Sequence, residues 1–151
     1  PGIKGAIALA DGTPTPIYHA LKSLSPQFVA IARELQPLES LAVYHAGMLP
    51  PGGEPLPTDA AFKLDPPLPQ MGYNPPERVR GALLGYFGKA GRPSHVVLVN
   101  LDYKTENTLT LVGPANLDTF DATGGTWSAV GSGRVRLQLP PGGGKLVRLS
   151  P

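Results

Sequence analysis

Four aromatic side chains are the residues of this sequence best suited to contact a ligand: Trp127, Tyr73, Tyr86 and Tyr103. Sugars present C–H faces that stack on flat rings, and aromatic rings bury a large area at a low entropy cost. Packing is the competing interpretation, and it is favoured for Trp127, which follows a Thr-Gly-Gly turn where tryptophan often fixes a hairpin to the core. Tyr73, in the loop sequence Gly-Tyr-Asn-Pro, is a candidate for contact with a ligand or a domain interface.

The acidic residues and histidines show no catalytic or metal-binding spacing. Asp118 and Asp121 lie near a predicted hairpin and are expected to be solvated surface acids. A catalytic carboxylate pair for glycoside hydrolysis would need a separation of about 5–5.5 Å or about 6.5–9.5 Å. His19, His45 and His95 are far apart, whereas a zinc or copper site usually includes a short-spaced pair of ligands. The sequence therefore predicts no catalytic residue, no cofactor and no metal ion.

Composition excludes several further classes. The 13 basic residues are scattered and the net charge is only +2, so nucleic acid is a poor candidate partner. Cysteine is absent, which excludes disulfides and thiolate metal sites and leaves the compartment open. No apolar run reaches the roughly 18 residues of a membrane span. Gly and Pro, 19 of each, separate clean apolar runs and therefore indicate turns and one long loop.

The first element expected is a helix over residues 17–36. Its apolar residues recur at steps of three and four and form one stripe. These residues are Tyr18, Leu21, Leu24, Phe28, Ile31 and Leu35. Pro26 removes one helical hydrogen bond, so the segment is either one kinked helix or two helices with Ser25 as the second N-cap. Because the stripe stays in phase across Pro26, we favour one kinked helix.

The pattern changes near residue 38 from helical periodicity to short strands. Strands without a second helix indicate a mainly β fold, an antiparallel sandwich or open barrel of about eight strands, preceded by one long amphipathic helix. The expected strands are 41–44, 82–88, 94–101, 107–112, 117–121, 126–130, 134–139 and 145–149, with a further short strand at 60–64. The proline-rich segment 48–78 is expected to be a long loop, either functional or covering a sheet edge.

Three stretches resemble a known family. They are GTPTPIYHALKSLSPQFVAIARELQPLESLAVYHAG (12–47), GYFGKAGRPSHVVLVNLDYKTENTLTL (85–111) and FDATGGTWSAVGSGRVRLQLPPGGGKLVRL (120–149). Together they resemble the C-terminal region of a TIM-barrel glycoside hydrolase of the β-galactosidase-like kind. The resemblance implies that residues 1–38 are the last helix segment of a barrel domain and that residues 39–151 are a C-terminal β-sandwich domain. It also implies that the two catalytic acids precede residue 1.

On this interpretation the fragment is not an enzyme. It is an ancillary domain of a glycoside hydrolase, and its partner is the catalytic barrel of the same parent chain. Three alternatives remain open. The first is a carbohydrate-binding module that uses exposed aromatic residues, and the second is an independent enzyme whose site the sequence does not reveal. The third is an oligomerisation or interaction module, with a homo-oligomer formed through the helix.

Overall fold

The structure, a computed structural model, describes residues 7–74 and 79–151. The chain divides into two compact units. The first, here called the helical unit, comprises Pro1–Pro37 and Asp121–Thr126. The second, the β unit, comprises Leu38–Phe120 and Trp127–Pro151. The β unit contains nearly all of the strands that the sequence predicts.

The helical unit is built around α1 (Pro16–Leu35), a helix of 20 residues. Pro16 occupies the start of the helix, where its missing N–H costs no hydrogen bond. The hydroxyl of Thr15 donates to the Ile7 carbonyl at 3.0 Å, which ties the preceding turn to the helix start. The prediction of a single helix that continues through Pro26 is confirmed. No residue of α1 is buried, although the helix carries a well-defined apolar stripe.

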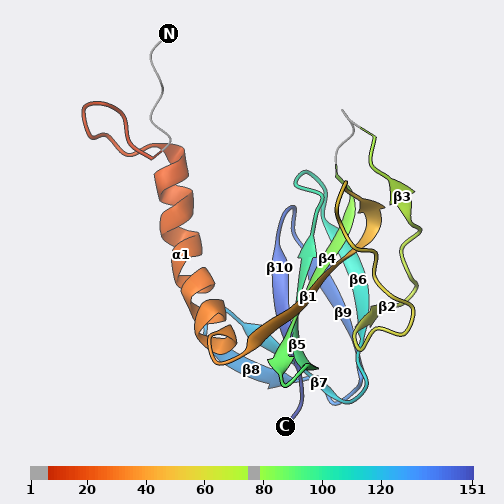
Figure 1. The fold of residues 1–151 in the computed structure, drawn as a ribbon. Coiled ribbons are helices and arrows are strands. Elements are labelled where there is room, and N and C mark those ends of the chain that lie inside the picture. The colour runs from red at the N-terminus through yellow and green to blue at the C-terminus, as the bar shows by residue number, and fades with distance from the viewer. Residues whose placement is uncertain (1–6, 75–78) are drawn as a thin grey trace. The chain divides into compact units, whose positions relative to one another are not determined.

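Ten strands follow in the described part of the chain (Figure 1). Their bounds are β1 (Glu39–Leu49), β2 (Lys63–Leu64), β3 (Met71–Gly72), β4 (Gly81–Lys89), β5 (Arg92–Asn100), β6 (Asn107–Val112), β7 (Leu117–Asp121), β8 (Thr126–Ala129), β9 (Arg134–Leu139) and β10 (Gly144–Leu149). Seven of them form one sheet in the order β3-β1-β4-β5-β10-β7-β8, and three form a second in the order β2-β6-β9. All pairs with a determined register are antiparallel except β1–β3. The predicted mainly β sandwich, preceded by one helix, is confirmed.

The core lies between the two sheets. The larger sheet contributes Leu84, Leu98 and Val147, all fully buried, to the same cluster as residues of the smaller sheet. In β6 and β9 the more buried residues alternate with the more exposed ones, because successive side chains of a strand point to opposite faces. The inward residues of these two strands include Leu109, Leu111, Leu137 and Leu139. The strict alternation of apolar and polar residues in 134–139 predicts that Leu137 and Leu139 face inward, and their burial confirms this for β9.

The first strand is longer than predicted, and β3 was not predicted at all. β1 pairs with β4 as far as the partners Gly47 and Gly81. A Cβ on Gly81 would lie 2.1 Å from the Ala46 carbonyl oxygen, so only glycine permits this close approach of the two backbones. Ala46, Gly47 and Met48 are all buried. This end of β1 therefore lacks the alternation of apolar and polar residues by which a strand is recognised in the sequence.

The inward and outward positions of β9 predict different responses to truncation. Leu137→Ala should lower the free energy of unfolding by ~2–5 kcal/mol, because Leu137 is buried and truncation leaves a cavity. Arg136→Ala should change it by less than ~0.5 kcal/mol, because Arg136 lies on the outward face. Denaturant titration of both variants measures the difference. Equal shifts of the two midpoints would contradict the register of β9.

Candidate functional site

The structure separates the aromatic residues that the sequence singled out. Tyr73, 39% exposed, directly follows β3, whereas Trp127 lies in β8. These strands form the two opposite edges of the seven-stranded sheet. Tyr103, 63% exposed, lies in the connection between β5 and β6, with the Lys104 ammonium 5.6 Å from its ring centroid. The exposed aromatic rings therefore do not form the continuous row along which a sugar chain could stack.

Tyr86 lies in the core, where it is only 3% exposed. Its hydroxyl donates to the Phe62 carbonyl and accepts from the Phe62 N–H, the latter at 3.2 Å. Its ring contacts those of Tyr44 and Phe62 edge to face, with centroids 5.2 and 5.6 Å away. Burial raises the pKa of the Tyr86 hydroxyl to about 12, so the group stays protonated and able to donate. These contacts give Tyr86 a structural role, which is to hold the segment before β2 against β4.

Trp127 is half-buried within a cluster of side chains from neighbouring strands. The Arg148 guanidinium lies 4.1 Å from the centroid of the indole ring, a cation–π arrangement. Phe120 and His95 contact the same indole, with ring centroids 5.0 and 5.8 Å away. His95 in turn has its Nδ1 atom 2.8 Å from the Ser94 hydroxyl. These contacts favour the packing interpretation of Trp127 over stacking against a sugar.

Asp118 is buried, 5% exposed, so the expectation of a solvated surface acid was wrong for this residue. The Ser150 hydroxyl donates to its Oδ1 atom at 2.6 Å, and the Arg148 Nε–H donates to its Oδ2 atom at 3.0 Å. The Ser150 bond, together with the bond and charge of Arg148, lowers the pKa of the Asp118 carboxyl against the opposing effect of burial. A lowered pKa is the opposite of what a general acid requires. Asp121, by contrast, is exposed and accepts the Thr123 N–H at 3.0 Å.

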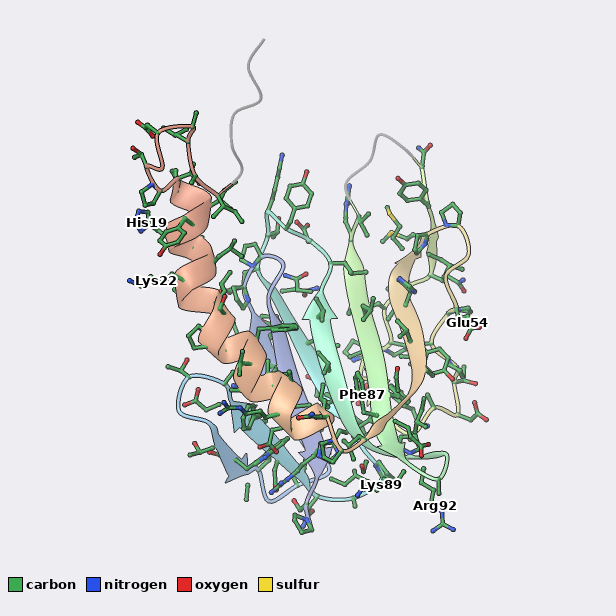
Figure 2. All side chains as sticks on the ribbon, turned by 60° about the vertical axis from the view of Figure 1, so that its left-hand side comes forward. His19, Lys22, Glu54, Phe87, Lys89 and Arg92 are labelled. Carbon is green, nitrogen blue, oxygen red and sulfur yellow. The ribbon has the colours of Figure 1, made fainter. Side chains whose placement is uncertain are left out.

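The three histidines come from separate elements. His19 lies on α1, where Figure 2 shows it beside Lys22, and His45 and His95 lie on β1 and β5. Within residues 7–74 and 79–151, no group of three or more His, Cys, Asp or Glu side chains could hold a metal ion. Nor does any helix in those ranges have the length and apolar character to cross a membrane.

A pocket in the β unit is the feature that the sequence did not reveal. It measures about 470 Å³ and lies between the proline-rich segment and the smaller sheet. Its walls come from three regions that are distant in the sequence: residues 56–67, Val112 and Arg134. The one available signal was the proline-rich composition of 48–78, which allowed either a functional loop or a cover for a sheet edge.

The hydroxyl of Tyr86 should contribute measurably to stability. Tyr86→Phe keeps the ring but leaves two backbone groups of Phe62 without this partner, and it should cost ~1–3 kcal/mol in the free energy of unfolding. The matched control is Tyr103→Phe, which removes the same atom from an exposed ring and should cost less than ~0.5 kcal/mol. Denaturant midpoints of the two variants provide the comparison. Equal midpoints for Tyr86→Phe and Tyr103→Phe would show that the hydrogen bonds of the Tyr86 hydroxyl do not contribute to the free energy of unfolding.

Asp118 should make stability depend on pH in the acid range. Because its pKa is lower in the folded protein, its contribution is present above the unfolded pKa of about 3.9 and is lost as the pH falls through the folded pKa. Asp118→Asn should therefore lower the melting temperature at neutral pH, and the gap to the wild type should narrow in acid. Asp121→Asn is the control and should have a smaller effect. A gap that stays constant with pH would contradict this assignment.

No family model, no curated protein and no solved structure matches this chain.

Proposed function

We propose that this chain is the C-terminal region of a glycoside hydrolase, in which the β unit is a non-catalytic ancillary domain and α1 belongs to the catalytic barrel. The parent enzyme is then the β-galactosidase-like barrel hydrolase that residues 12–47, 85–111 and 120–149 resemble. The role of the β unit is to support the barrel, and the catalytic carboxylates belong to the barrel strands.

The observation that carries the proposal is the exposed apolar stripe of α1. Phe28 is 73% exposed, Leu24 55% and Leu21 43%, and all three lie on the stripe. Isolated helices of this length are marginal in water, so most of their stability must come from packing of an apolar face. A barrel would supply that packing, because the outer helices of a barrel bury one face against its sheet.

The environment of Asp118 also favours a supporting role for the β unit. Its carboxylate is held in the charged form by Ser150 and Arg148, and Arg148 also stacks on Trp127. This polar cluster thus joins β7, β8 and the C-terminal strand β10 to one another. Such a cluster stabilises the sheet edge and offers no proton to a leaving group.

The decisive test is the sequence encoded immediately before residue 1 in the gene. We expect eight βα repeats there, with glutamates at the ends of the fourth and seventh strands, because a retaining or inverting glycosidase needs two carboxylates. An upstream sequence without such repeats, or a start codon directly before residue 1, would overturn the proposal.

The stripe can also be tested on the 151-residue chain itself. Without a barrel, α1 must pack against another surface of this chain or a second copy, so Phe28→Ser with Ile31→Ser should lower the helix content or convert a dimer to a monomer. The control is His19→Ser with Lys22→Ser, which changes polar residues of the same helix (Figure 2). Circular dichroism and light scattering measure both properties. If the two double variants behave alike, the stripe is not a packing face.

A further inference from the structure

The pocket of the β unit has the size and lining of a small-molecule site. Its volume of about 470 Å³ falls within the roughly 300–1,000 Å³ that is typical of such sites. Its apolar walls are aliphatic side chains and proline rings, without an aromatic face. They are Leu56, Pro57, Leu64, Pro67 and Val112. Thr58, Lys63, Asp65 and Arg134 are its polar members. A few polar groups around an apolar interior are the usual composition of a binding pocket.

Backbone hydrogen bonds fix the walls of the pocket. The Leu56 N–H donates to the His45 carbonyl at 2.9 Å, and this bond holds one wall to β1. The Asp65 N–H donates to the Thr110 carbonyl at 3.0 Å, which holds the opposite wall to β6. Between these two points, the Tyr86 hydroxyl binds both backbone groups of Phe62. The pocket is therefore formed before a ligand arrives, which reduces the entropy cost of binding.

The rim of the pocket is positively charged. The strand register pairs Val112 with Lys63 on one side and with Arg134 on the other, so both cations lie on the outer face of the smaller sheet. Asp65 is the single acid of the lining, and it forms an ion pair with Nη1 of Arg134. Two cations and one carboxylate leave a charge of +1 at the rim. The guanidinium has further N–H donors beyond Nη1, and Lys63 is exposed.

A second, smaller hollow adjoins this pocket. This hollow of about 190 Å³ shares three lining residues with the first: Leu56, Thr58 and Pro67. Most of its remaining lining is apolar, including Ala46 and Leu68. The three shared residues therefore place the two hollows next to each other along the proline-rich segment.

We propose that this pocket binds a small aliphatic carboxylate. The carboxylate lies at the rim between Lys63 and Arg134, and the aliphatic tail contacts Leu56, Pro57 and Val112. The positive rim selects an anionic head group over a neutral one. The aliphatic walls select a chain of methylenes over a sugar ring, which would need a flat aromatic face or more hydrogen-bonding groups. The proposal does not depend on the glycoside hydrolase assignment, because all the residues concerned belong to the β unit.

The test is calorimetric titration of the 151-residue chain with octanoate and, separately, with 1-octanol. We expect saturable binding of one octanoate per chain and weaker binding of octanol. Lys63→Gln should weaken octanoate binding by about two- to fivefold and leave octanol binding unchanged. The matched control is Lys89→Gln, which removes a lysine at the tip of the β4–β5 hairpin (Figure 2) and should not change binding of either compound.

A second variant separates this pocket from other apolar surfaces, including the stripe of α1. Val112→Trp places a large side chain in the pocket at a position on the outer face of its strand, and it should abolish octanoate binding while the circular dichroism spectrum is retained. Octanoate binding that survives in folded Val112→Trp would overturn the proposal. Three other results would also overturn the proposal. They are no binding of octanoate to the wild-type chain, equal affinity for octanoate and octanol, and an equal effect of Lys63→Gln and Lys89→Gln on octanoate affinity.

Discussion

The two hydrogen bonds between the Tyr86 hydroxyl and the backbone of Phe62 are the constraint on which the proline-rich segment of the β unit depends. The segment around Phe62 has almost no strand pairing of its own, since β2 contains only two residues. Prolines cannot donate backbone hydrogen bonds, so a segment rich in them needs attachment by other means. Tyr86, in β4, attaches this segment to the larger sheet through its hydroxyl. The Phe62 ring is thereby placed between the sheets, where it is fully buried. Together with the backbone hydrogen bonds that hold Leu56 to β1 and Asp65 to β6, this attachment positions the residues that line the pocket.

The two units of the chain differ in how far their apolar residues are buried. In the β unit, the inward residues of both sheets share one core, and the polar groups near it have specific partners, as Asp118 has in Ser150 and Arg148. α1 has an equally regular apolar pattern but no buried residue. An exposed apolar stripe lowers solubility because it associates with other apolar surfaces. Such a stripe is therefore expected where another surface covers it. This contrast is the physical basis for the proposal that α1 belongs to a neighbouring domain.

The sequence predicted those parts of the fold that depend on local patterns. Alternation located β9 at its true bounds, and three- and four-residue periodicity located α1. The sequence did not predict those features that depend on contacts between residues far apart in the chain. Asp118 was expected in solvent because its two hydrogen-bond partners, Arg148 and Ser150, lie 30 and 32 residues away in the sequence. Residues close to Asp118 in the sequence do not predict these contacts. The pocket was missed for the same reason: its walls meet only after β2 has paired with β6, and β6 with β9.

The edges of the larger sheet have a consequence for the behaviour of the protein at high concentration. An exposed edge strand offers unpaired backbone groups to other chains and can seed aggregation. Here β3 pairs only with Met48 and Leu49 at the end of β1, so most of this 11-residue strand lies at one edge of the larger sheet, whereas β8 at the other edge has only four residues. On the smaller sheet, the edge strand β9 carries Arg134 and Arg136, whose charges repel an approaching copy of the same strand. These charges oppose edge-to-edge growth at the smaller sheet, whereas the part of β1 that β3 leaves uncovered is the long edge of the larger sheet.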